Sequence, residues 1–126
     1  MTDHRSKGTR IRRQVLGDAH VDRAEAEQTE FDAAYQDLIT QSAWGHVWAS
    51  DAISMRERSM ITLALLAATG SFDEIPMHIR ATVRTGASQR DVLAAFQHVA
   101  IYAGVPKANR AIKIAKATYA EMDAER

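Results

Sequence analysis

The feature that most constrains the fold is a series of helix-start and helix-end signals separated by single glycines. Ser54 and Glu57 are three residues apart and form a capping-box pattern, and Gly70 stands where a C-terminal cap belongs. The pattern predicts a helix over residues 55–69. Its nearly apolar stretch, residues 60–68, is much too short to cross a bilayer and therefore predicts a buried central helix.

Similar signals predict helices along the rest of the chain. They are expected over residues 8–16, after Thr29, over 73–85, from Ser88 to Gly104, and from Pro106 onward. Residues 18–22, with the sequence DAHVD, are expected to be irregular. No alternating strand pattern competes with this interpretation. The sequence therefore predicts an all-α single domain over residues 1–126, with about six helices.

Composition excludes several classes of function. The chain has 126 residues, and sixteen Lys and Arg balance sixteen Asp and Glu, so no overall positive field favours nucleic acid or an anionic membrane. There is no cysteine, which excludes thiolate catalysis and disulfides, and the five histidines show no metal-binding spacing. The polar N-terminus contains no signal or anchor pattern, so a cytoplasmic location is expected.

Four segments carry a resemblance to a known family. RERSMITLALLAATGSFDEIPMHIRATVRTG (56–86) and FQHVAIYAGVPKANRAIKIAK (96–116) resemble the core of the carboxymuconolactone decarboxylase family. RIRRQVLGDAHVDRA (10–24) and AWGHVW (43–48) resemble its true decarboxylase branch. The resemblance implies an alkyl hydroperoxidase D-like orthogonal helical bundle and a ring-like homo-oligomer, expected to be a hexamer. It also implies an activity in the protocatechuate branch of the 3-oxoadipate pathway.

The peroxidases that share this fold carry a C-x-x-C pair, and this chain does not. Ser71 and Glu74 stand at the corresponding positions, upstream of His78. Dithiol peroxidase chemistry is therefore excluded.

The reaction that the resemblance implies needs no cofactor. The substrate would be a small dicarboxylate lactone, 4-carboxymuconolactone, which loses CO2 to give 3-oxoadipate enol-lactone. The electrons left behind can spread into the lactone carbonyl, so the substrate supplies its own electron sink and neither an organic cofactor nor a metal is required. The protein must then stabilise the dienolate, deliver a proton and hold the second carboxylate.

Three residues are candidates for the chemistry. The resemblance makes His78 the first candidate for the general acid, and a histidine suits that role because its ordinary pKa is about 6.5. Glu57 could orient a histidine, or it could serve only as the capping residue of its helix. His98 is a second acid or an oxyanion donor. Both histidines could instead simply pack among apolar neighbours.

Three other residues are candidates for substrate binding. Arg13 and His20 lie in the segment typical of the decarboxylase branch, and Arg can hold a carboxylate through two parallel hydrogen bonds. Tyr102, four residues after His98, is a candidate pocket wall or donor. Arg80 and Arg84 point largely away from His78 on a helix and are expected to lie outside the site.

Other functions remain open at this point. The chain could act as a related decarboxylase or isomerase on another lactone or 3-oxo acid. It could also be a non-catalytic helical binding or assembly module. A DNA-binding helix-turn-helix is a poor third because no basic recognition face is evident.

Overall fold

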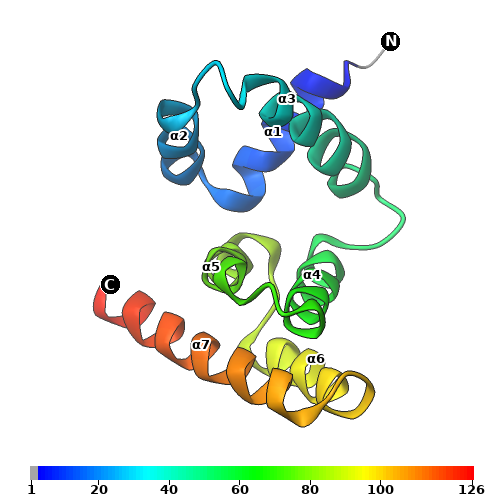
Figure 1. The fold of residues 1–126 in the computed structure, drawn as a ribbon, viewed down its shortest axis with the longest axis vertical. Coiled ribbons are helices and arrows are strands. Elements are labelled where there is room, and N and C mark those ends of the chain that lie inside the picture. The colour runs from blue at the N-terminus through cyan, green and yellow to red at the C-terminus, as the bar shows by residue number, and fades with distance from the viewer. Residues whose placement is uncertain (1–2) are drawn as a thin grey trace. The chain divides into compact units, whose positions relative to one another are not determined.

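The computed structural model describes residues 3–126 and contains helices, with no strand in that range (Figure 1). The α-helices are α1 (His4–Leu16), α2 (Asp18–Glu27), α3 (Ala33–Ile39), α4 (Met55–Thr69), α5 (Ile75–Thr85), α6 (Gln89–Tyr102) and α7 (Val105–Ala124). A π-helix, η1, covers Thr40–Trp48, and a short 3-10 helix, η2, covers Phe72–Glu74. The predicted all-α class is confirmed. No helix among the described residues has the length and apolar character needed to span a membrane.

The chain folds as two compact units. Unit 1 comprises the described residues up to Ser54, and unit 2 comprises Met55–Arg126. The single domain predicted over the whole chain stays a prediction.

In unit 1, α1 packs against η1 so closely that two glycines are required. A Cβ atom on Gly8 would lie 2.0 Å from the carbonyl oxygen of Thr40, and a Cβ atom on Gly45 would lie 2.2 Å from that of His4. Real side chains do not approach backbone atoms so closely, so each helix can reach the other only where a side chain is absent.

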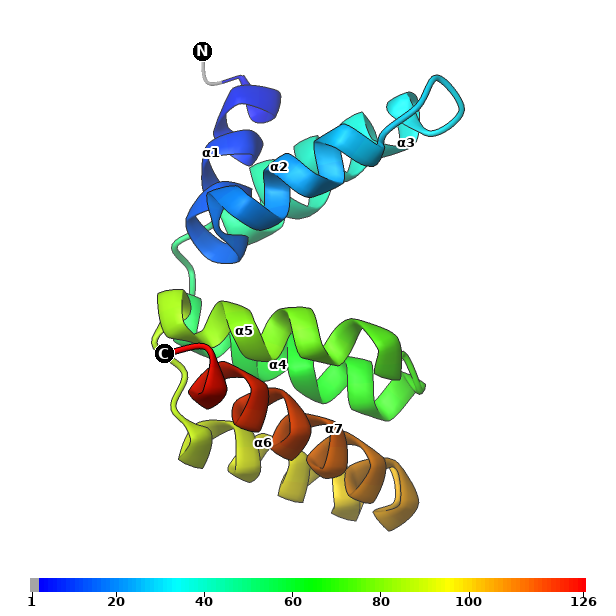
Figure 2. The same ribbon diagram turned by 90° about the vertical axis from the view of Figure 1, so that its left-hand side faces the viewer.

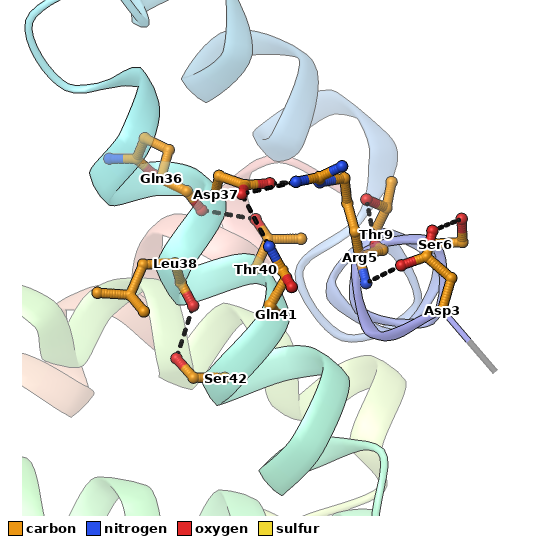
Figure 3. Close-up of polar contacts among 10 residues, drawn as sticks. All are labelled: Asp3, Arg5, Ser6, Thr9, Gln36, Asp37, Leu38, Thr40, Gln41 and Ser42. Atoms are coloured by element: carbon orange, nitrogen blue, oxygen red, sulfur yellow. Dashed lines mark hydrogen bonds and ion pairs between the residues drawn. The ribbon is translucent and has the colours of Figure 1, made fainter. Parts of the chain in front are cut away.

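An ion pair joins α1 to α3 at the edge of this contact. Figure 3 shows Arg5 reaching Asp37, with 2.9 Å between Nη2 of the arginine and Oδ2 of the aspartate. Gln41 donates to the same carboxylate at 2.8 Å. The Arg5 side chain is largely exposed and that of Asp37 is partly exposed, so this ion pair contributes more to orientation than to stability.

Two expectations for unit 1 were wrong. Residues 18–22 belong to α2 rather than to an irregular segment, because Gly17 lets the chain turn and start a new helix that buries Val21. The segment after Thr29 also differs, since α3 begins only at Ala33 and passes directly into the π-helix. Along this segment Phe31, Tyr35 and Leu38 are exposed.

In unit 2, four helices surround one apolar core (Figure 2). α4 packs against α5 and α6, and α7 packs against the same two helices from the other side. Figure 1 shows the result for residues 55–126, in which α5 and α6 stand at opposite corners. The buried core residues are mostly aliphatic, with one aromatic ring: Leu63, Ala67, Ile75, Ile79, Val92, Phe96, Val99, Ala108, Ala111 and Ala115.

The helix bounds predicted for unit 2 agree well with the structure. α4 begins at Met55 and ends at Thr69, as predicted. The capping box of Ser88 and Asp91 at the start of α6 is present, with both reciprocal hydrogen bonds formed. Pro76 and Pro106 each lie in the first turn of their helix, where the missing N–H is tolerated. α5 starts later than predicted because η2 covers residues 72–74.

The start of α6 is tied to the start of α4 by an ion pair. Arg56 donates from Nη2 to Oδ1 of Asp91 at 2.7 Å and from Nε to Oδ2 at 2.8 Å. The Arg56 hydrogen bonds, together with the backbone N–H of Ser88, hold the pKa of Asp91 far below its usual range. Asp91 therefore stays charged at acid pH and serves both the cap and the ion pair.

Acid should destabilise unit 2 partly through Asp91, and removing Arg56 should weaken that effect. A carboxyl group whose pKa is lowered on folding stabilises the protein above its ordinary pKa, about 3.9, and this contribution is lost as the pH falls toward the folded value. We expect Arg56→Met to lower the urea midpoint at neutral pH and to flatten its decline between roughly pH 5 and pH 2. Arg90→Met, exposed on the same end of α6, is the control. An unchanged slope in Arg56→Met would contradict the prediction.

Candidate functional site

The six residues predicted for the site are divided between the two units. Glu57, His78, His98 and Tyr102 lie in unit 2, and these four can be compared directly. Arg13 and His20 lie in unit 1.

His78 lies in the first half of α5 and is buried, with 7% of its surface exposed. Thr82 and Thr85 follow it at spacings of four and seven residues, so the three polar side chains share one buried face of the helix. An imidazole in such a position is shielded from water, which strengthens its electrostatic interaction with any bound reactant. Of the six predicted residues, His78 is the one that is buried.

The buried polar face of α5 meets hydroxyl groups from both neighbouring helices. Ser59 of α4 and Thr85 share a hydrogen bond of 2.7 Å between their hydroxyl oxygens, and both residues are buried. On the other side, Tyr119 of α7 neighbours Thr82, and burial raises the pKa of Tyr119. These hydroxyl groups were not predicted from the sequence, because Ser and Thr at helical spacing give no distinctive pattern.

Glu57 lies in the first turn of α4 and is exposed. The Ser59–Thr85 hydrogen bond places the start of α4 beside the end of α5. His78 precedes Thr85 by seven residues, which corresponds to about 10 Å along the helix axis. Glu57, near the start of α4, therefore lies toward the C-terminal end of α5, whereas His78 lies in the first half of α5. Their spacing in the sequence could not reveal this relation. The cap role of Glu57 and its catalytic role both stay predictions.

His98 and Tyr102 form a stacked pair on the outer side of α6. Their ring centroids are 4.8 Å apart with an interplanar angle of 24°. Both side chains are exposed, Tyr102 by 79%. Because α6 and α5 occupy opposite corners of unit 2, the structure does not bring His98 beside His78 within this unit. His98 and Tyr102 therefore lie side by side, as residues four apart on a helix do, on the surface of unit 2.

Arg13 joins α1 to α2 through three acidic side chains. Its guanidinium lies 3.1 Å from Asp18, 2.9 Å from Asp22 and 3.3 Å from Glu25. The hydrogen bonds that Arg13 donates to Asp22 and Asp18, that to Asp22 foremost, together with the nearby charge of Glu25, raise the pKa of Arg13. A substrate carboxylate would have to compete with all three. His20 lies on α2 and is partly buried.

Arg80 and Arg84 are the two arginines that were expected to lie outside the site. Arg80 reaches α7, where it pairs with Glu121 at 3.0 Å and Glu125 at 2.9 Å. Arg84 is exposed near the end of α5. Arg80 therefore fastens the last turns of α7 to α5 instead of facing a reactant.

A surface hollow of about 480 Å³ lies in unit 1, and neither Arg13 nor His20 lines it. It is lined by His4, Leu38, Gln41, Ser42, Ala43, His46 and Val47. The rings of His4 and His46 are 5.7 Å apart, and Nδ1 of His4 lies 3.3 Å from the carbonyl oxygen of Gly45. The two histidines are 42 positions apart, so no local motif could have linked them. Among the described residues, no group of three or more His, Cys, Asp or Glu side chains is placed to hold a metal ion.

The hydroxyl pair beside α5 should be energetically coupled. Ser59→Ala leaves the buried Thr85 hydroxyl without this partner and should lower the free energy of unfolding by about 1–3 kcal/mol. Removing both hydroxyls, in Ser59→Ala with Thr85→Val, should cost clearly less than the sum of the single changes. Urea unfolding of the four proteins measures the coupling, and Ser71→Ala, at an exposed position, is the control. Strictly additive losses would argue against a coupled pair.

Comparison with known proteins identifies relatives over most of the chain. Residues 33–117 match the carboxymuconolactone decarboxylase family. A 4-carboxymuconolactone decarboxylase from Acinetobacter baylyi is 33% identical over 116 residues, which cover 92% of this chain and 87% of that protein. The nitrosuccinic acid decarboxylase npaB from Metarhizium robertsii is 31% identical over 116 residues, which cover 92% and 81%. A 4-carboxymuconolactone decarboxylase from Pseudomonas putida is 47% identical over 38 residues, which cover 30% and 79%.

Proposed function

The chain belongs to the carboxymuconolactone decarboxylase family, and on that premise we propose that it decarboxylates 4-carboxymuconolactone to 3-oxoadipate enol-lactone in protocatechuate degradation. The observation that carries the proposal is the match to the Acinetobacter baylyi enzyme along nearly the whole chain. The proposal includes the cytoplasmic location expected from the sequence, and neither nucleic acid nor a membrane as a partner.

The proposed reaction places specific demands on the protein. When the C–C bond to the leaving carboxylate breaks, its electron pair passes through the ring double bond to the lactone carbonyl and forms a dienolate. CO2 leaves as this bond breaks, and a proton is then added to the carbon next to the lactone carbonyl. The substrate accepts the electrons itself, so the protein has to supply a proton, a donor for the dienolate oxygen and a water-poor surface.

His78 is the residue that we propose as the proton donor. It is buried on α5 among Ile75, Ile79 and the two threonines of the polar face, so its imidazole is held in a site from which water is largely excluded. Glu57 and His98 complete the proposed catalytic set, and Arg13, His20 and Tyr102 the proposed substrate-binding set. The reaction requires neither a metal nor an organic cofactor, because the lactone is the electron sink.

A second substrate class is supported by the nitrosuccinic acid decarboxylase among the relatives. In nitrosuccinic acid the nitro group can accept the electrons that decarboxylation releases, as the lactone carbonyl does. A related decarboxylase acting on such a dicarboxylic acid is therefore the main alternative. The same alternative includes decarboxylation or isomerisation of another lactone or of a 3-oxo acid. The remaining alternative is a non-catalytic helical binding or assembly module.

We also propose that the protein is a homo-oligomer, with the hexamer as the expected form. Several large apolar side chains are exposed on the single chain, both in unit 1 and in unit 2. They include Phe31 in unit 1 and Leu65, Val83 and Ile101 in unit 2. Soluble monomers rarely leave so many large apolar groups in water, so subunit contacts would account for them.

Purified protein should release CO2 from 4-carboxymuconolactone without any added cofactor. The expected product is 3-oxoadipate enol-lactone, followed by NMR or by chromatography against an authentic standard. Nitrosuccinic acid and a 3-oxo acid should be tested in parallel, each with heat-inactivated protein as the control. A well-folded preparation that turns over nitrosuccinic acid and leaves the lactone unchanged would favour the alternative substrate class.

Replacing His78 should remove most of the activity. We expect His78→Ala and His78→Asn to lower kcat/KM by roughly a hundredfold or more, the usual contribution of a positioned acid or base. Circular dichroism checks that each variant is folded, since the position is buried. Arg84→Ala, exposed on the same helix, is the matched control and should keep the wild-type rate. A folded His78 variant with nearly normal kcat/KM would assign the proton donor to another residue.

A further inference from the structure

Arg12, next to Arg13 on α1, is a partly buried cation that is bonded to no acidic group. It lies on the side of α1 that is turned toward the protein, since Gly8, four positions before it, and Val15 and Leu16, three and four positions after it, are all buried. The Arg12 side chain is itself partly buried. Among residues 3–126, no carboxylate lies within hydrogen-bond or ion-pair distance of its guanidinium.

Other arginines that are covered to a similar degree have their charge compensated. The side chain of Arg13 is 28% exposed and pairs with three carboxylates. Arg80 pairs with two carboxylates of α7. A guanidinium that loses water without gaining an anionic partner costs free energy, so such pairs are the usual arrangement.

The charges around Arg12 do not make up for its burial. Burial lowers the pKa of Arg12; the charge of Glu25 opposes this shift, and the like charge of Arg13 adds to it. Glu25 itself lies 3.3 Å from the guanidinium of Arg13. Arg12 is therefore a partly desolvated donor group whose hydrogen bonds are not taken up by the protein, and such a group favours an anion.

The proposed reaction needs one cation of this kind. The carboxylate that leaves as CO2 loses its charge during the reaction, so a cation paired with it would stabilise the ground state and slow the reaction. The carboxylate on the CH2 arm keeps its charge throughout. An arginine can hold that group through two parallel hydrogen bonds without raising the barrier. Arg13 would have to give up its own ion pairs to do so, and Arg12 would give up none.

We propose that Arg12 binds the carboxylate that the substrate retains, and that the ion pairs of Arg13 hold α1 and α2 in the arrangement that presents Arg12. This inference rests on the decarboxylase activity proposed above and names the residue that selects substrates with an acidic arm. Arg12 is then a specificity-determining residue, and Arg13 beside it is a positioning residue.

A pair of probes that differ only in charge tests the role of Arg12. The probes are the saturated lactone that carries the CH2-carboxylate arm and the primary amide of the same compound. Neither carries the carboxylate that leaves as CO2, so calorimetry measures binding without turnover. Wild-type protein should bind the acid roughly ten- to hundredfold more tightly than the amide, the range expected for hydrogen bonds to a charged group.

Replacing Arg12 should remove this preference for the acid. In Arg12→Met the affinity for the acid should fall to that of the amide, and the affinity for the amide should stay unchanged. Arg12→Lys keeps the charge without the two parallel hydrogen bonds and should restore part of the preference. In turnover, Arg12→Met should raise KM and leave kcat within a few fold, because the arm is held equally in the ground and transition states.

Two neighbouring arginines provide matched controls. Arg10→Met removes an exposed charge from the same helix and should keep the wild-type preference. Arg13→Met should weaken the binding of both probes and keep the preference between them, because Arg13 acts through the positions of α1 and α2. Circular dichroism checks that each variant is folded.

The outcomes separate this inference from the function on which it rests. A wild-type protein that binds neither probe or binds both equally, or a folded Arg12→Met that still prefers the acid, would overturn the role of Arg12 even if the lactone is decarboxylated. If only nitrosuccinic acid is decarboxylated, the proposed function fails and the comparison is made with the product of that reaction and its amide. If neither is decarboxylated, the proposed function also fails, and the acid and amide probes still decide whether Arg12 binds a carboxylate.

Discussion

Burial of α4 is the interaction on which the rest of unit 2 depends. Leu63 and Ala67 of this helix are fully enclosed, and α5, α6 and α7 all contact it. The facing residues of α7 are alanines at 108, 111 and 115, whose small side chains let the helix approach the core closely. Apolar burial on this scale supplies most of the driving force that holds a small helical domain together. The other three helices therefore take their positions from α4.

The buried face of α5 carries polar side chains, which reduce the apolar burial that drives folding. His78, Thr82 and Thr85 occupy positions that aliphatic side chains would fill more favourably, and each polar group must find a partner within the protein. The hydroxyl of Ser59 meets this need for Thr85, and the carbonyl of Ile79 accepts from Thr82 at 2.5 Å. A run of polar groups in a core is usually retained for a function. In this protein the buried polar positions of α5 include His78, the residue proposed as the proton donor.

Sequence reasoning succeeded where local signals were strong. Capping residues and prolines predicted α4, α6 and α7 because these groups act within one turn of a helix, and the family segments predicted the family. The same reasoning failed at residues 18–22, where the turn at Gly17 and the burial of Val21 stabilise a helix that the short polar segment does not suggest. It also could not predict that Glu57 lies toward one end of α5 and His78 toward the other, or that His98 is exposed. Those relations depend on how helices pack across the bundle, and spacing along one helix contains no information about them.

The close contact of α1 with η1 at Gly8 and Gly45 also limits which substitutions the chain can accept. At each of these two positions a Cβ atom would collide with backbone atoms of the other helix. The two glycines are therefore expected to be retained together or replaced together. A single replacement at Gly8 or Gly45 would move a whole helix, and with it the tryptophans that η1 buries. Removing the first turns of α1 would likewise expose the surface of η1 that carries Gly45. The N-terminal helix is thus a permanent component of unit 1, and a shortened protein that starts after Gly8 should be expected to lose the order of η1 as well.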